Sequence, residues 1–227
     1  MINALLRAPA LVLLLSACQF GQVPPVTGGP DSNCAHSWDG NHLPHDALDS
    51  VVLNNSSSAF VADLTLWNMD GNPITLKHKG PGFPIEIVDR GDADSGWLGL
   101  AEIWKRDGHI ARARVSINMV LMRKAAARYD ISLTDMVLHV GWQEIGHVAG
   151  LDHQRGVDDS AMEDCVGRSD WPTCISNPKA VGFNGHDIQE LYSIYRHVNA
   201  DSLPPACAGS GGAAIIVHTF PLEGAQP

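Results

Sequence analysis

One run of eleven residues constrains this chain more than any other feature: QEIGHVAGLDH, residues 143–153. Residues four apart lie on the same face of an α-helix, one turn above each other, so Gln143 and His147 point at the same spot. Glu144 lies to one side of that line, close enough to touch a water held there. Gly150 can adopt the positive φ with which many helices end, and the chain can then return His153 toward the same spot.

Side chains that converge in this way are typical of a metal site. Zinc prefers imidazole nitrogen, and three protein ligands with one position left for water are typical of catalytic zinc. A carboxylate beside such a water can act as a general base. We therefore expect His147 and His153 to hold a metal ion, and Glu144 to accept a proton from water.

The same run resembles the zinc-binding helix of the metzincin peptidases, whose pattern is H-E-x-x-H-x-x-G-x-x-H. The Glu, the second His, the Gly and the third His are in register, and Gln143 stands where the pattern has its first His. Met162, nine residues past His153, lies in a Ser-x-Met sequence that is similar to the Met-turn beneath the metal in this family. The segment FNGHDIQELYSIY, residues 183–195, is similar to the closing helix of the matrixin branch.

This resemblance extends over roughly residues 45–197. It implies an α+β fold, with a twisted, mostly parallel sheet and two main helices, followed by a small C-terminal subdomain that carries the Met-turn and the last helix. It also implies a zinc-dependent endopeptidase with one catalytic Zn²⁺, acting on a peptide or protein. In such an enzyme the metal activates a water, and Glu144 takes the water proton and delivers it to the leaving amine.

Gln143 is the departure from the pattern. Its amide oxygen reaches about as far as a His ring, but zinc binds such an oxygen less tightly. Three alternatives follow: Gln143 or a water completes the site of a weakened peptidase; the metal is held poorly and the domain is a catalytically silent, protein-binding surface lipoprotein; or a harder cation replaces zinc. His139 cannot substitute, because eight residues of helix separate it from His147, about 12 Å along the axis.

Residues 1–17 have the short apolar run of a signal peptide and are too short to span a bilayer as a helix. They lead into Leu15–Cys18, which resembles the lipobox of bacterial lipoproteins, in which Cys18 becomes the lipidated first residue. The alternative is an ordinary signal peptide followed by a chance cysteine. Gln19 is not the Asp that retains lipoproteins at the inner membrane, so we expect an exported lipoprotein at the outer membrane or cell surface. Residues 18–33, rich in Gly and Pro, indicate a flexible tether.

The other four cysteines are Cys34, Cys165, Cys174 and Cys207. An even number in an exported chain suggests disulfides, and four cysteines allow three connectivities. We favour Cys165–Cys174, which closes a short loop, and Cys34–Cys207, which ties the ends of the domain together. A cysteine metal site is disfavoured because the chain has no C-x-x-C. In matrixins the segment after the Met-turn, here residues 163–182, shapes a substrate pocket, so the first disulfide would either pre-order that pocket or brace a long loop.

The chain has 227 residues and a formal net charge of −10, and without residues 1–17, which contain Arg7, the balance is near 14 − 25 = −11. An acidic protein of this kind is not a nucleic-acid binder, and anionic lipid heads repel it, so its membrane link would be the lipid alone. We expect one monomeric peptidase-like domain at 34–207 and a poorly ordered tail at 208–227, of which only the apolar segment 213–217 is suited to dock.

Local patterns also predict individual elements. We expect strands at 47–53, 73–77 and 84–88, a strand pair at 99–105 and 109–118 joined by a turn at 106–108, and helices at 57–67, 133–149 and 185–197. Ser132 with Asp135 three residues later predicts a cap at the start of the helix at 133–149.

The loop DRGDADSG, residues 89–96, brings together Asp89, Asp92 and Asp94 where matrixin-like domains often bind Ca²⁺. Calcium takes six or more oxygen ligands, and this stretch alone supplies too few. A solvated acidic turn is therefore favoured over a calcium site, which stays an alternative.

Overall fold

The computed structural model describes residues 42–68, 71–91, 93, 96–106, 109–154, 156–157, 159–165, 168–195 and 215–217. The predictions made for the signal peptide, the tether and most of the tail concern residues outside these ranges. The same is true of Cys18, Cys34, Cys207, Asp92 and Asp94.

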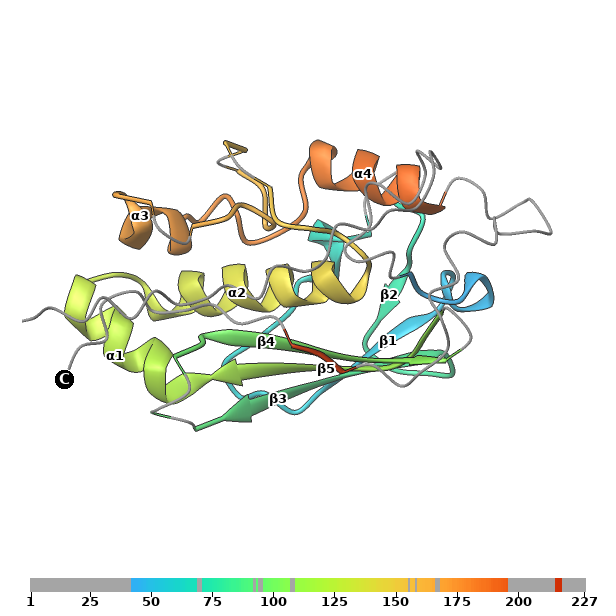
Figure 1. Ribbon diagram of the computed structural model, residues 1–227, viewed down its shortest axis with the longest axis horizontal. Coiled ribbons are helices and arrows are strands. Elements are labelled where there is room, and N and C mark those ends of the chain that lie inside the picture. The colour runs from blue at the N-terminus through green and yellow to red at the C-terminus, as the bar shows by residue number, and fades with distance from the viewer. Residues whose placement is uncertain are drawn as a thin grey trace, which may run out of the picture.

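A six-stranded sheet forms one side of the molecule (Figure 1). Its strands are β1 (Val51–Asn55), β2 (Leu76–Lys77), β3 (Phe83–Arg90), β4 (Gly99–Arg106), β5 (His109–Asn118) and β6 (Ile215–Val217). Their order across the sheet is β2-β1-β3-β5-β4-β6. The β1–β2, β1–β3 and β3–β5 pairs are parallel, whereas β4 is antiparallel to both β5 and β6. The sheet is therefore mostly parallel, as predicted.

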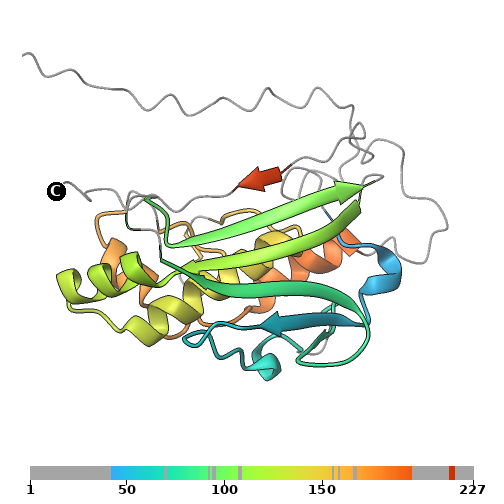
Figure 2. The same cartoon turned by 90° about the horizontal axis from the view of Figure 1, so that it is seen from below.

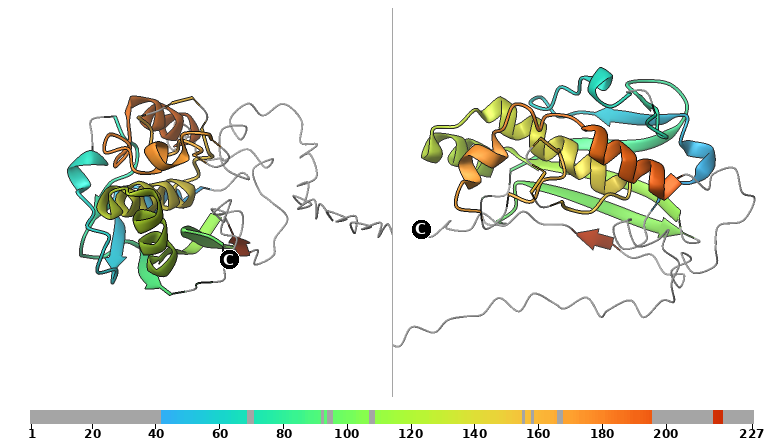
Figure 3. Two further views of the ribbon diagram at one scale, coloured as in Figure 1. Left: turned by 90° about the vertical axis from the view of Figure 1, so that its left-hand side faces the viewer. Right: turned by 90° about the horizontal axis from the view of Figure 1, so that it is seen from above.

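The helices lie in two further layers (Figure 3). α1 (Met119–Tyr129) and α2 (Leu133–Val148) cover one face of the sheet, and α3 (Trp171–Ile175) and α4 (Gly185–Tyr195) lie beyond α2. The hydrophobic core lies between the sheet and the helices, and this arrangement confirms the predicted α+β class. Among the described helices, none has both the length and the apolar character required to cross a bilayer.

The helix α2 carries the residues of interest and begins and ends as its sequence predicts. The Ser132 hydroxyl accepts the Asp135 N–H at 3.2 Å. At the other end Gly150 has φ of 98°. The Gly150 N–H donates to the His147 carbonyl and the Leu151 N–H to the Gly146 carbonyl, the two bonds of a Schellman ending. This ending turns the chain sharply after the last turn of the helix.

The helix predicted at 57–67 is wrong: only the short 3₁₀ turn η3 (Leu64–Leu66) forms there. The Ser57 hydroxyl donates to the carboxylate of Asp89, which holds the start of the segment against the end of β3. Trp67 is fully buried and stacks on an aromatic ring of α2. The helix-like spacing of apolar residues at 57–67 therefore reflects their tertiary contacts and not a helix.

Three further elements differ from the predictions. The strand predicted at 47–53 begins only at Val51, because residues 45–47 form a 3₁₀ turn, η2 (His45–Ala47). The strand predicted at 73–77 is reduced to the two residues of β2. The helix α1 is not indicated by the patterns above; the Asn118 side chain caps it by accepting the Leu121 N–H at 3.3 Å.

Candidate metal centre

His147 and His153 face each other across the turn that ends α2. Their Nε2 atoms are 3.1 Å apart, and their rings meet edge to face with centroids 4.6 Å apart. The Nδ1 atom of His147 lies 2.9 Å from the Leu151 carbonyl oxygen, which can only accept, so Nδ1 carries the proton and Nε2 presents a lone pair. Tetrahedral zinc holds two imidazole nitrogens roughly 3.3 Å apart. The separation of the two Nε2 atoms therefore fits ligands of one metal ion.

Gln143 lies one turn before His147 and is fully buried. Its Nε2 donates to the Glu163 carbonyl oxygen at 3.0 Å, and its Oε1 has no hydrogen-bond partner among the described residues. A buried oxygen left in this state costs about 1–3 kcal/mol. A cation beside Oε1 would remove that cost.

The described part of the chain holds no group of three or more His, Cys, Asp or Glu side chains suited to a metal ion. Two imidazoles are present, so a third protein ligand has to be of another type. Gln143, on the same helix face as His147, supplies such an oxygen. The donor set therefore fits a metal ion, with weaker binding of zinc than three imidazoles would give.

Glu144 is fully buried against the first residue of β4. A Cβ added at Gly99 would lie 2.6 Å from its Oε1, so no larger residue fits there. Within the described residues neither carboxylate oxygen has a hydrogen bond of ordinary geometry. Burial raises the pKa of Glu144 well above its usual range, and an interaction with the Ala101 backbone counteracts only part of this rise. A carboxyl group with a raised pKa is suited to hold a proton between two transfers.

Met162 is fully buried and packs against Gly146, the residue before His147. The Ser160 hydroxyl accepts the Met162 N–H at 2.9 Å and donates to the buried Asp187 carboxylate at 2.5 Å. The Met162 carbonyl accepts the Gln154 N–H at 2.7 Å, next to His153 in the chain. The predicted turn therefore connects α4 to the segment that carries the second histidine.

Glu163 contributes to the site in a way that the motif does not indicate. Its carbonyl accepts the Gln143 amide, and its carboxylate, almost fully buried, accepts the Val157 N–H at 2.8 Å and pairs with Arg168. The carboxylate thereby fixes the backbone that orients Gln143. Its position next to Met162 is the one sequence signal that could have identified it.

Asp89, the one described member of the predicted acidic cluster, has its carboxylate engaged by two serines. It accepts from the hydroxyl groups of Ser57 and Ser58 and from the Ser58 N–H at 3.0 Å. This carboxylate anchors the segment after β1. The calcium alternative stays a prediction, because Asp92 and Asp94 lie outside the described ranges.

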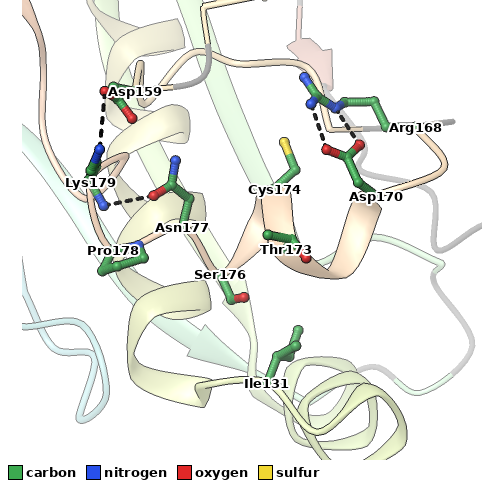
Figure 4. Close-up of a pocket in the computed structure, with 10 residues that line it drawn as sticks. All are labelled: Ile131, Asp159, Arg168, Asp170, Thr173, Cys174, Ser176, Asn177, Pro178 and Lys179. Atoms are coloured by element: carbon green, nitrogen blue, oxygen red, sulfur yellow. Dashed lines mark hydrogen bonds and ion pairs between the residues drawn. The ribbon is translucent and has the colours of Figure 1, made fainter.

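Cys165 and Cys174 form the predicted disulfide, with Cα atoms 5.7 Å apart. Beside it is a pocket of about 380 Å³ that extends from Ile131 to α3 and the loop after it (Figure 4). The charged groups of this pocket are paired, Arg168 with Asp170 and Lys179 with Asp159. Ile131 precedes Leu133, the first residue of α2, which is about 15 Å along the helix axis from Gln143, so this wall of the pocket is remote from the two histidines.

Comparison of the chain with models of protein families, with curated proteins and with solved structures finds no match. The functional assignment therefore depends on the residues and the geometry given above.

Proposed function

We propose that the protein is a zinc-dependent endopeptidase of the metzincin type, closest to the matrixin branch. His147, His153 and Gln143 would hold the metal ion, and Glu144 would be the general base. The observation that carries the proposal is the pair of Nε2 atoms 3.1 Å apart; the buried carboxylate of Glu144, on the same helix as His147, supports it.

The zinc ion, when bound, polarises the scissile carbonyl and lowers the pKa of water. Glu144 accepts the proton of the attacking water and passes it to the leaving amine. The Leu151 carbonyl holds His147 in the tautomer that leaves Nε2 as a lone pair. The Glu163 carbonyl holds the Gln143 amide with its oxygen unbonded. Met162 packs against Gly146 near the end of α2.

His147, His153 and Gln143 together should bind zinc more weakly than the three histidines of the H-E-x-x-H-x-x-G-x-x-H pattern. An amide oxygen is a harder and weaker donor than an imidazole nitrogen, so the bound fraction depends on the free zinc concentration. We further propose that the protein is exported and anchored through a lipid on Cys18, for which the sequence from Leu15 to Cys18 is the support.

The test is metal content together with proteolysis. The full chain is dialysed against trace zinc, the metal is counted by elemental analysis, and casein digestion is followed in parallel, with His147→Ala and Glu144→Gln as controls. Near one zinc per chain, lost in His147→Ala, together with digestion that Glu144→Gln removes, supports the proposal. A chain that retains no zinc and digests nothing overturns it.

Gln143 favours a second candidate, a catalytically silent domain of the same type that binds a protein partner. The substitution Gln143→His separates the two. A large gain in casein digestion indicates a peptidase whose cleft is otherwise intact, whereas no gain in a variant that binds zinc indicates a binding domain.

A further inference from the structure

Glu163 connects two separate parts of the proposed metal centre. Its backbone carbonyl accepts the Gln143 amide at 3.0 Å, and its carboxylate accepts the Gly156 N–H at 3.1 Å and the Val157 N–H at 2.8 Å. Gly156 and Val157 follow His153 closely in the chain. One residue therefore fixes the side chain of one proposed ligand and also the turn that follows another.

Arg168 supplies the positive charge that this buried carboxylate requires. Glu163 has an exposed fraction of 1%, and Nη1 of Arg168 donates to its Oε1. A buried carboxylate stays ionised and in place only while it is paired, and the loss of one partner leaves a charge that has to reach water or take up a proton. Without Arg168 the carboxylate of Glu163 is therefore expected to move and to release the backbone N–H groups at 156 and 157.

Asp170 holds the guanidinium of Arg168 from its other side. Nε of Arg168 donates to Oδ1 of Asp170 at 2.8 Å, and Nη2 donates to Oδ2 at 2.7 Å (Figure 4). This bidentate pair leaves Nη1 for Glu163. Because a guanidinium is planar and its donors have fixed directions, Asp170 decides where Nη1 points. Asp170 immediately precedes α3, so the position of α3 is passed on to Glu163.

The Cys165–Cys174 disulfide closes the loop that contains this arginine. Cys174 belongs to α3, which packs against α2, and both helices lie behind the strands in Figure 2. The Arg168 N–H donates to the Cys165 carbonyl at 3.3 Å, and the Cys174 N–H donates to the Asp170 carbonyl at 3.0 Å. A cross-link restricts the conformations of the loop that it closes. The disulfide therefore keeps Asp170, and with it Arg168, beside Glu163.

One end of the disulfide is within reach of a small thiol. Cys165 is fully buried, whereas Cys174 is partly exposed and lines the pocket of about 380 Å³ beside α3. A thiolate in this pocket attacks the sulfur of Cys174 and forms a mixed disulfide, while the sulfur of Cys165 leaves and takes up a proton. A second thiol attacks the sulfur of the first, so that Cys174 is released as a thiol and the two small thiols leave as their disulfide. Two electrons thus pass from the small thiols to the protein.

We infer that Arg168 is a positioning residue for the metal centre, and that the Cys165–Cys174 disulfide holds it in place, so that the centre binds metal tightly only in the oxidised chain. The inference rests on the proposed function, because it takes Gln143 and His153 as metal ligands. Loss of a residue that orients metal ligands typically weakens metal binding by about 10–100-fold. The alternative is that the disulfide only braces a long loop, in which case its loss leaves the metal ligands unaffected.

The test compares variants of the full chain. Arg168→Met removes the guanidinium and keeps the disulfide, whereas Cys165→Ala with Cys174→Ala removes the disulfide and keeps the guanidinium. A triple variant combines these changes. Lys179→Met is the matched control, because it breaks the other ion pair of the same pocket, that of Lys179 with Asp159 at 4.0 Å. Two quantities are measured: hydrogen exchange of the amides at 156 and 157 in the metal-free chains, and zinc affinity by competition with a chromophoric chelator.

Arg168→Met and the disulfide variant should both show faster exchange at 156 and 157, and both should bind zinc roughly tenfold more weakly or worse. Lys179→Met should match the native chain in both measurements. The triple variant should bind zinc no more weakly than Arg168→Met, because both changes act through the same contact. Arg168→Lys keeps a charge for Glu163 without the planar fork, so it should recover part of the affinity, and it replaces Arg168→Met if that variant does not fold.

The redox dependence is measured on the metal-free native chain, because free thiolates would themselves bind zinc. The folded chain is treated with reduced glutathione, new thiols are alkylated, and mass spectrometry identifies the labelled cysteines. We expect Cys165 and Cys174 to be labelled, and exchange at 156 and 157 to rise to the level of the disulfide variant. A disulfide that glutathione leaves intact in the folded chain overturns the redox dependence.

Unchanged exchange in Arg168→Met and in the disulfide variant overturns the inference, because neither contact then holds the turn. Faster exchange with native zinc affinity also overturns it, in favour of a disulfide that only braces its loop. If exchange changes as expected but the native chain itself binds no zinc, the proposed function fails, while the coupling of Arg168 and the disulfide to the turn stands.

Discussion

Gln143 and Glu163, 20 residues apart in the sequence, are joined by a hydrogen bond of 3.0 Å from the side-chain amide to the backbone carbonyl. This bond decides which atom of the amide remains for a metal. The Glu163 carbonyl oxygen accepts a hydrogen bond from the NH₂ group of Gln143, so Oε1 of Gln143 is left without a partner among the described residues. Gln143 therefore offers one donor atom, its amide oxygen, on the helix face where the pattern has a histidine.

Substitution of Gln143 should change zinc affinity in both directions. We expect Gln143→His to bind zinc at least about tenfold more tightly, because imidazole replaces an amide oxygen. Gln143→Leu, which fills similar space without a donor, should bind about tenfold less tightly. Competition with a chromophoric chelator measures both. Equal affinity of Gln143→Leu and the native chain would show that the amide oxygen is not a ligand.

Substitution of Glu144 should separate metal binding from catalysis. We expect Glu144→Gln to retain zinc and to lose casein digestion by about 10²–10⁴-fold, because an amide of the same shape cannot accept the water proton. The control is His147→Ala, which should lose both zinc and digestion. Digestion that persists in Glu144→Gln at the native rate would remove this residue from the mechanism.

Asp187 should make the domain more stable as the pH falls from 6 to 4. Burial raises its pKa to about 6, against lowering contributions from the Ser160 hydroxyl and the Asn184 backbone. The folded state then binds a proton more tightly than the unfolded state, in which the pKa is about 3.9, so stability decreases by about 3 kcal/mol as the pH rises through this window. Asp187→Asn should lack this contribution and should therefore lose stability relative to the native chain as the pH falls from 6 to 4.

Urea unfolding of the metal-free chain between pH 4 and 7 measures the difference between the two proteins. Asp159→Asn is the matched control, because Asp159 is exposed and pairs with Lys179 at 4.0 Å. Parallel curves for the native chain and Asp187→Asn would show that the Ser160–Asp187 contact does not carry the pH dependence.

The parts of the structure that the sequence predicts are those set by short-range chemistry. Ser132 caps α2 three residues away, Gly150 ends it, and β4 and β5, two residues apart in the chain, pair antiparallel. The spacing of His147 and His153 similarly brings their rings together once the helix ends. In each case the signal and the contact lie within about ten residues of each other in the sequence.

The features that could not be predicted depend on contacts between distant residues. The Ser57–Asp89 bond spans 32 residues and replaces a predicted helix. The Glu163 carbonyl reaches Gln143 only after the chain has left α2 and folded back against it. The register of β6 on β4 is another case, because the apolar run at 213–217 indicates a segment able to pair without indicating which edge receives it.

His139 should give the opposite pH dependence to Asp187. It is fully buried, and burial lowers its pKa to about 4, against raising contributions from the Cys174, Ile175 and Ala161 backbones. The unfolded state, with a pKa of about 6.5, binds the proton more tightly, so His139 makes the folded chain less stable, by about 3 kcal/mol, as the pH falls from 6.5 to 4. His139→Leu removes the titrating group while filling similar space.

We therefore expect His139→Leu to lose less stability than the native chain on acidification, as measured by urea unfolding of both metal-free proteins at pH 4.5 and 7. The double variant His139→Leu with Asp187→Asn should lose both opposing contributions and follow the native pH dependence more closely than either single variant does. If the native chain and His139→Leu lose the same stability, the pKa of His139 is the same in the folded and unfolded states. That outcome would contradict the burial of His139 as the cause of a lowered pKa.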